Sequence, residues 1–505
     1  MSDIFQTAPD YGHFNGDFGG SANEYDLSKA GTSSVTTSQV CFQTPPTPAP
    51  RTTRNFLKYV TPSAAASKIL IQVVLAKQRR YPYGSLTYCF LRQCVIDGTD
   101  ASEGLLHSSS LSNQGTIQET VMTRLRDTLP AAMLFLVAAT MMLALANSKA
   151  QSKQEKRPFG KTQDGQPADL YILTNNAGFE VAITNYGGTV VSLKAPDRNG
   201  KMADVILGYD SVTGYENGKA YFGGTIGRYG NRIAHGKFVM NGATYTLAKN
   251  DGENHLHGGL IGFNKRVWNA KDVSSIAGQA LELSYLSKDG EEGYPGNLSA
   301  KVVFTVLADS NALKIEYRAT TDKETIVNLT NHAYFNLAGQ GNGNILGHQL
   351  TLHAGKFTPV DAALIPTGEL RSVRNTPLDF LKPLAIGPRI AQDNEQLIFG
   401  KGYDHNWVLD RTSAEALSRA AEAYDPQSGR VLKVSTTEPG IQFYSGNFLD
   451  GTIHGKDGKI YPHRSAFCLE TQHFPDSPNH PNFPSTVLKP GQHYRSTTVY
   501  EFSTR

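Results

Sequence analysis

The sequence contains little cysteine for its length, with four cysteines in 505 residues. Cys41, Cys89 and Cys94 lie in the first hundred residues, and Cys468 is the only cysteine in the long C-terminal part. A framework of disulfide bonds therefore cannot support that part of the chain. The cysteines and histidines also do not cluster at the spacing of structural zinc sites.

An excess of one charge and helical periodicity are also missing. The formal net charge is +3, and no long basic run occurs, so neither nucleic acid nor an anionic membrane is an expected partner. Amphipathic helices are nearly absent, and strands do not alternate with helices as they do in a parallel βαβ sheet. These absences favour an all-β fold.

The first 121 residues have the composition of a disordered extension. They contain a Gly/Ser-rich stretch (GDFGGSAN), a Pro-rich patch (TPPTPAPRT) and a serine run (HSSSLSNQG). The apolar run ILIQVVLAK is the only strong candidate for a strand or helix. So little apolar surface does not offset the entropy lost on ordering, and we predict that residues 1–121 are mostly disordered.

Residues 122–150 have the pattern of a secretory signal peptide in an internal position. Arg124 and Arg126 precede an uncharged apolar stretch, which is followed by the small residues Ser148 and Ala150. We favour Met122 as the true start, with the first 121 residues a spurious extension; the alternative is a transmembrane anchor of about the minimum length. A cleaved signal would place the mature domain, free of the membrane, in the periplasm or outside the cell, and otherwise we expect a cytoplasmic protein.

Residues 151–505 are dominated by the period-two alternation of β-strands. ALKIEYRA and FEVAIT place their apolar side chains on one face, and KFVMNGATYTL contains two such runs joined by Asn241 and Gly242, a pair suited to a type I′ hairpin turn. SAEALSRAAEA (413–423) has helical composition but precedes a turn and a strand, so a helix and a hairpin arm are both open. We predict a single domain, a large antiparallel β-sandwich.

Polar motifs rich in glycine, asparagine and histidine punctuate these predicted strands. In chain order they are GRYGNRI, LHGG, NHAYFNLAG, DHNW, QFYSGNFLDG and CLETQHFPDSPNHPNFP. Each motif alone is compatible with a turn or an irregular loop. Together they indicate a polar site built from several strands and loops.

These six motifs, in this order, resemble the aldose 1-epimerase (galactose mutarotase) family from about Asn185 to the C-terminus. The resemblance implies an antiparallel β-sandwich of the supersandwich type. It also implies an isomerase that interconverts the α and β anomers of free aldohexoses, such as glucose and galactose, without a cofactor or metal. By this resemblance His332 is the general acid and Glu470 the general base. The residues expected to contact the sugar are Arg232, His257, Asp404 and Gln442, with Asn231 and Tyr334 added because they lie beside matched positions.

The chemistry of ring opening requires such a pair. One proton must leave the C1 hydroxyl of the sugar while another reaches the ring oxygen, so a base and an acid must flank C1. We expect Glu470 to be ionised and His332 to be protonated, with the acidic Asp404 and Glu470 favouring the imidazolium. By period-two counting Cys468 shares a face with Glu470, so Cys468 either lies next to the site or marks irregular backbone.

Four other interpretations remain open from the residues alone. His255 and His257, with His332 and His405, could form a metal site. Asp404 and Glu470 could be the two carboxylates of a glycoside hydrolase. A non-catalytic carbohydrate-binding sandwich would keep the sugar contacts but would not need the acid/base pair. A relative acting on phosphorylated sugars would need additional Arg or Lys residues near the site. The sequence specifies neither the preferred sugar nor an oligomeric state.

Overall fold

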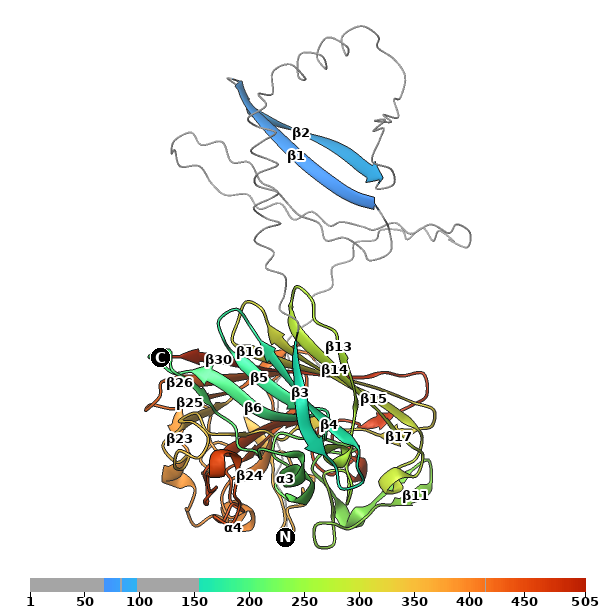
Figure 1. The fold of residues 1–505 in the computed structure, drawn as a ribbon, viewed down its shortest axis with the longest axis vertical. Helices are drawn as coiled ribbons and strands as arrows, with labels where there is room; N and C mark the ends of the chain where they lie inside the picture. The colour runs from blue at the N-terminus through green and yellow to red at the C-terminus, as the bar shows by residue number, and fades with distance from the viewer. Residues whose placement is uncertain (1–67, 82–83, 98–153, 414) are drawn as a thin grey trace, which may run out of the picture. The chain divides into compact units, whose positions relative to one another are not determined.

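The structure is a computed structural model that describes residues 68–81, 84–97, 154–413 and 415–505. The chain divides into two units, residues 1–125 and 126–505. In the first unit, β1 (Lys68–Tyr81) and β2 (Gly84–Asp97) form an antiparallel hairpin (Figure 1). The apolar run ILIQVVLAK is therefore part of a strand. The predictions for the rest of residues 1–121 and for residues 122–150 fall outside the described residues.

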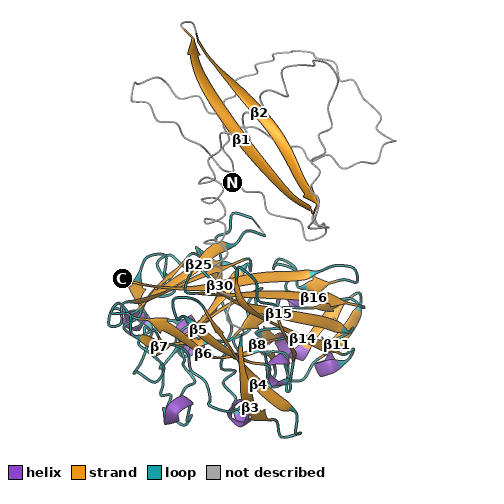
Figure 2. Ribbon diagram, turned by 45° about the horizontal axis from the view of Figure 1, so that its top comes forward, coloured by secondary structure: helices purple, strands orange, loops and turns teal. Residues whose placement is uncertain are grey.

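Three antiparallel sheets make up most of the second unit (Figure 2). The five-stranded sheet contains, in spatial order, β3 (Glu155–Lys161), β4 (Pro167–Thr174), β5 (Glu180–Thr184), β6 (Thr189–Pro196) and β7 (Met202–Asp204). The nine-stranded sheet contains β13 (Asn269–Asp272), β14 (Gly278–Ser287), β15 (Leu298–Leu307), β16 (Ala312–Thr321), β30 (Tyr494–Thr504), β26 (Arg430–Thr436), β25 (Ser418–Tyr424), β20 (Gln349–Leu352) and β23 (Leu384–Ala385). The six-stranded sheet contains β19 (Tyr334–Phe335), β28 (Phe467–Gln472), β27 (Gly440–Tyr444), β24 (Asp404–Val408), β21 (Lys356–Thr358) and β22 (Arg371–Ser372).

Short strand pairs and short helices connect these sheets. The strand pairs are β8 (Thr225–Ile226) with β18 (Thr330–Asn331), β9 (Arg232–Ile233) with β12 (His255–Leu256), β10 (Lys237–Met240) with β11 (Ala243–Thr246), and β17 (Thr325–Ile326) with β29 (Val487–Leu488). The α-helices of the described ranges are α3 (Val212–Asn217) and α4 (Glu395–Gly400). No helix in those ranges is both long and apolar enough to cross a membrane.

The main hydrophobic core receives side chains from all three large sheets. Leu173 of β4, Phe304 of β15 and Phe443 of β27 belong to it and are fully buried. Leu170, on the other face of β4, packs in a second apolar cluster. The five-stranded sheet is therefore buried on both faces at β4 and β5, whereas the six-stranded sheet has one apolar face and one face that carries polar side chains.

The all-β prediction is confirmed, and two local predictions can be compared with the strands. Asn241 and Gly242 join β10 to β11 with φ angles of +52° and +77°, as a type I′ turn requires. Of the two possibilities for residues 413–423, the hairpin arm is correct from Ser418 onward, because β25 pairs with β26. Cross-strand pairing and burial of Ala421 and Ala423 in the core outweigh the helical propensity of this alanine-rich segment.

Candidate functional site

The polar face of the six-stranded sheet is a consequence of strand alternation. In β28, Phe467 and Leu469 enter the main core, so Cys468 and Glu470 point to the opposite face. Gln442 of β27 is the register partner of Glu470 and shares this face. All of these residues are buried, and the site is therefore formed by polar groups enclosed within the protein.

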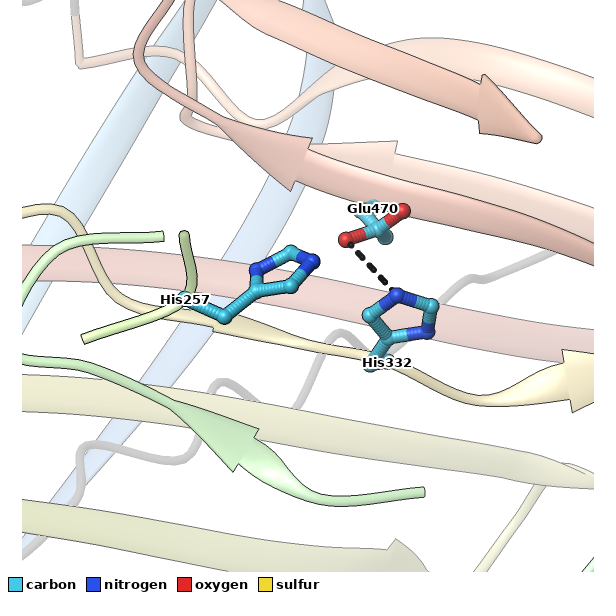
Figure 3. Close-up of side chains that lie close together, drawn as sticks. All are labelled: His257, His332 and Glu470. Carbon is cyan, nitrogen blue, oxygen red and sulfur yellow. Dashed lines mark ion pairs between the residues drawn. The ribbon is translucent and has the colours of Figure 1, made fainter. Parts of the chain in front are cut away.

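His332 and Glu470 form the central pair of this face. His332 lies in the extended connection between β18 and β19, and its Nε2 atom is 3.6 Å from Oε2 of Glu470 (Figure 3). The side chains are only 6% and 3% exposed. Oε2 of Glu470 makes no hydrogen bond within the described part of the chain. The structure therefore brings together the two residues predicted as acid and base and leaves one carboxylate oxygen free to bind a proton.

Asn231 fixes the orientation of His257 through two backbone hydrogen bonds. The Asn231 N–H donates to Nδ1 of His257 over 3.2 Å, and the His257 N–H donates to the Asn231 carbonyl over 3.0 Å. Both residues have positive φ, +62° and +51°, a conformation that asparagine and histidine adopt more readily than most residues. The imidazole of His257 is thereby held beside His332, with ring centroids 5.1 Å apart.

Arg232 follows Asn231 and is held by a carboxylate. Its Nε atom donates to Oδ2 of Asp251 over 2.8 Å, and its side chain is 10% exposed. The remaining guanidinium N–H groups can donate to a ligand from a fixed position. Asp251 lies shortly before the LHGG motif but was not predicted as a site residue.

Tyr334 and Asp404 complete the predicted set. The Tyr334 ring lies 5.0 Å from the imidazole of His332 and within 16° of parallel to it. Asp404 is buried, and its Oδ1 accepts a hydrogen bond of 2.7 Å from Nε2 of Gln442. Gln442 thus lies against Asp404, which it orients.

A single cavity of about 1290 Å³ joins these side chains. The predicted residues that line it are Asn231, Arg232, His257, His332, Tyr334, Asp404 and Glu470. Gln442 is absent from the cavity lining in the described part of the chain. The sequence also missed Tyr221, a lining residue whose ring contacts both His257 and His332; its only signal is its place before the glycines of AYFGG.

Burial controls the protonation of the central pair, and the predicted sign for His332 is wrong. Removal from water lowers the pKa of His332 to about 4. The same effect, reinforced by the charge of Asp404, raises the pKa of Glu470 well above its ordinary value. The expectation that nearby carboxylates would favour the imidazolium fails because desolvation is the largest influence on His332, and only a backbone hydrogen bond opposes it. The pair by itself therefore favours a neutral imidazole and a protonated carboxyl group.

Cys468 lies beside His332 and Glu470. Of the two alternatives predicted for it, a place next to the site is the one observed. β28 pairs regularly with β27, and Sγ of Cys468 is 3.5 Å from Nδ1 of His332. Burial raises the pKa of the Cys468 thiol well above its usual range, so the group is a thiol rather than a thiolate. The backbone of β28 at Cys468 is therefore regular, and the residue lies next to the site.

The four-histidine metal site considered from the sequence is not assembled. Nε2 of His255 bonds with the Tyr294 hydroxyl and Nδ1 with the Ala248 carbonyl. His405 lies on the face of β24 opposite to Asp404, where its ring contacts that of Trp407. Neither imidazole lines the cavity that contains His257 and His332.

His257, His332 and Glu470 could in principle hold a metal ion, since one ligand atom of each lies within 4.8 Å of the others. Nδ1 of His257, however, accepts a hydrogen bond from the Asn231 N–H. A neutral imidazole that accepts at Nδ1 carries its hydrogen on Nε2, the nitrogen that faces Glu470 in Figure 3. His257 therefore offers the cavity a hydrogen-bond donor, which suits a sugar oxygen better than a metal ion.

Comparisons with known proteins show the family to which the chain belongs. The family model described as aldose 1-epimerase matches residues 169–501. The galactose mutarotase of Sus scrofa is 46% identical over 345 residues, which are 68% of this chain and 97% of the relative. The aldose 1-epimerase of Escherichia coli is 40% identical over 341 residues, or 67% of this chain and 96% of the relative.

A solved structure also supports membership of this family. The crystal structure of an aldose epimerase homologue from C. elegans superposes with a TM-score of 0.61 at 32% identity, covering 67% of this chain and 99% of the homologue. Residues 1–168 lie outside the region that the family model matches. The chain belongs to the aldose 1-epimerase family of isomerases that act on sugars.

Proposed function

We propose that the cavity binds a free aldohexose, such as glucose or galactose, and that His332 and Glu470 interconvert its α and β anomers. The observation that carries this proposal is the 3.6 Å separation of Nε2 of His332 and Oε2 of Glu470 in the cavity wall. The C1 hydroxyl and the ring oxygen are bonded to the same carbon of a cyclic aldose. One acid and one base on neighbouring side chains can therefore serve both oxygens.

The reaction consists of ring opening, rotation and closure. Glu470 accepts the proton of the C1 hydroxyl while His332 donates a proton to the ring oxygen, and the bond between C1 and the ring oxygen breaks. The product is an open-chain aldehyde. Rotation about the C1–C2 bond presents the other carbonyl face, and the C5 hydroxyl attacks C1 as both proton transfers run in reverse. The opposite anomer forms without any net change in the protein.

The pKa shifts of His332 and Glu470 favour the stage of the reaction at which the sugar ring is open. Opening converts an imidazolium and a carboxylate into a neutral imidazole and a carboxyl group, which is the state that burial favours for His332 and Glu470. The total number of protons on the pair is the same in both states. The low polarity that would penalise two separated charges thus stabilises the pair while the sugar is open.

The other lining groups supply complementary hydrogen bonds to the sugar. Arg232 and Nε2–H of His257 are donors, and the Asp404 carboxylate is an acceptor held by Gln442. Burial raises the pKa of Asp404, and a donating sugar hydroxyl would favour its charged form. These fixed groups keep C1 beside His332 and Glu470 and restrict water in the site.

Polarimetry tests this function against two of the alternatives, a glycoside hydrolase and a non-catalytic carbohydrate-binding module. Freshly dissolved α-glucose and α-galactose should mutarotate faster with the protein than without it, and His332→Ala should remove the acceleration. A glycoside hydrolase would instead release sugar from a glycoside, and a binding module would accelerate neither reaction. Sugar release from a methyl glycoside without accelerated mutarotation would contradict the proposal.

We retain the signal peptide as the proposed role of residues 122–150, with a mature domain outside the cytoplasm. Support comes from the order of Arg124, Arg126, the apolar stretch and the small residues Ser148 and Ala150. Mass spectrometry of the native N-terminus tests it. A mature end near Ala150 supports the proposal, and a peptide from the first hundred residues contradicts the start at Met122.

A further inference from the structure

Tyr221 lies in the cavity wall against both imidazoles of the site. Its ring centroid is 4.7 Å from that of His257 and 5.9 Å from that of His332. Its plane is within 19° of the His332 ring, and Tyr334 contacts the same imidazole at 16°. His332 is therefore in contact with two nearly parallel tyrosine rings, of which only Tyr334 belongs to a recognised motif.

The backbone holds Tyr221 in place through the segment that carries His332. The His332 N–H donates to the Gly224 carbonyl over 3.0 Å, and the Gly223 N–H donates to the His332 carbonyl over 2.9 Å. Asn331 adds a side-chain bond of 2.8 Å to the Gly223 carbonyl. Tyr221 itself has φ of +57°, an unfavourable value for a bulky residue that the surrounding structure must enforce.

The neighbouring residue shows that the orientation of Tyr221 is specific. Phe222 is 1% exposed and packs in the second apolar cluster, where its ring contacts those of Tyr334 and Tyr461. This anchor directs the preceding side chain into the cavity. An apolar residue at position 221 would satisfy the packing against the imidazoles equally well, so the phenol oxygen needs a separate explanation.

The phenol oxygen of Tyr221 makes no hydrogen bond to any described residue. Burial raises the pKa of Tyr221, the charge of Asp251 adds to this effect, and Arg232 opposes it. The hydroxyl therefore stays protonated and can donate to a ligand. Contact of the Tyr221 ring with that of His257 places Tyr221 beside one of the predicted sugar contacts.

We propose that Tyr221 is a further substrate-binding residue, whose phenol O–H donates a hydrogen bond to one hydroxyl of the bound sugar. This inference rests on the proposed function. The ring of Tyr221 keeps His257 and His332 in orientation, and its hydroxyl contributes to sugar recognition. The two contributions are separable, because Tyr221→Phe removes only the hydroxyl.

Steady-state polarimetry of Tyr221→Phe is the first test. Loss of one hydrogen bond to the sugar should raise KM about three- to tenfold, with kcat within about twofold of the wild type. Tyr245→Phe is the matched control, because Tyr245 packs on Phe238 and does not line the cavity. An unchanged KM in Tyr221→Phe would overturn the inference.

Deoxy sugars distinguish a direct contact from a structural effect. Wild type and Tyr221→Phe are compared on glucose and on its 2-, 3-, 4- and 6-deoxy derivatives. The derivative that lacks the partner hydroxyl should show no additional rise in KM in the variant, whereas the others should show the full rise. Equal additional losses on all derivatives would overturn a direct contact.

Polarimetry of variants at His332 and Glu470 separates this inference from the proposed function. Full activity in His332→Ala or Glu470→Gln would contradict the function assigned to the pair. If those variants are inactive while Tyr221→Phe behaves as the wild type, only the role of Tyr221 is refuted.

Discussion

Extending the pairing of Tyr334 with Cys468 by two residues places His332 opposite Glu470. β19 and β28 are antiparallel, with Tyr334 the register partner of Cys468, and a step of two residues returns each side chain to the same face. The two functional groups then approach to 3.6 Å, a separation expected for cross-strand neighbours. The register of β19 with β28 thus directs the adjoining residue His332 toward Glu470, and the backbone bonds of His332 to Gly223 and Gly224 hold it there.

Replacing either member of this pair should abolish most of the activity. His332→Ala removes the group proposed to protonate the ring oxygen, and Glu470→Gln removes the proposed proton acceptor while keeping its shape. Each change should lower kcat at least about 10²-fold, the usual contribution of one positioned proton transfer. Polarimetry of α-galactose measures it, and His493→Ala is the control because His493 is exposed. Activity near that of the control in either variant would contradict the assignment.

The pH dependence should reflect a pair that shares one proton. Below about pH 4 His332 is protonated together with Glu470, so no base remains, because burial lowers the pKa of His332 to about 4. At high pH Glu470 also loses its proton and no acid remains, and its raised pKa places this limb above the ordinary range of a carboxyl group. Enzymatic kcat/KM, corrected for the spontaneous reaction, should therefore not decline near pH 6.5. An acid limb at that pH would mean that His332 behaves as an exposed histidine.

The predicted strands and the order of the motifs were readable from the sequence because both depend on local patterns. Alternation in ALKIEYRA corresponds to β16, and the motifs NHAYFNL and CLET locate His332 and Glu470. Such patterns state which residues share a face and which chemistry they can perform.

Properties set by the fold as a whole were not readable in this way. The pKa of His332 depends on the depth at which the cavity encloses it, and desolvation reverses the sign that counting nearby carboxylates predicts. The contact of Gln442 with Asp404 arises from the pairing of β24 with β27. Tyr221 reaches the site only because its segment bonds to that of His332. Each of these results needs the positions of distant segments.

Loosening Arg232 should weaken sugar binding more than catalysis. Asp251→Asn removes the charge that holds the guanidinium at 2.8 Å. Because the Asp251 side chain is 37% exposed, solvent screening limits the effect to about 1 kcal/mol, or up to about a fivefold rise in KM. Steady-state polarimetry measures it, with exposed Asp309→Asn as the control. A large fall in kcat at unchanged KM would show that Asp251 acts on the chemical step.

Chelation should leave the activity unchanged. His257 directs a hydrogen toward Glu470 because its Nδ1 accepts from the Asn231 N–H, so the three grouped side chains lack one lone pair for a metal ion. Prolonged EDTA treatment followed by polarimetry and metal analysis checks this. Loss of activity that Zn²⁺ restores would contradict the hydrogen position assigned to His257.

Several buried histidines other than His332 should make the fold sensitive to acid. Burial lowers the pKa of His348 to about 4 and that of His405 to about 3. In the unfolded chain a histidine has a pKa of about 6.5. As the pH falls below that value, the unfolded state takes up protons that the folded state does not, and the free energy of unfolding decreases until the folded-state pKa is reached.

His348 offers a clean test of this linkage. Its Nε2 accepts a hydrogen bond of 3.0 Å from the Leu337 N–H, and a glutamine oxygen can accept in its place. His348→Gln should make the free energy of unfolding fall less steeply between pH 6.5 and 4, by up to about 1.4 kcal/mol per pH unit. Urea denaturation at a series of pH values measures this slope, and exposed His493→Gln serves as the control. If His348→Gln and the wild type lose stability at the same rate, then His348 must gain its proton in the folded state, and burial does not hold it neutral.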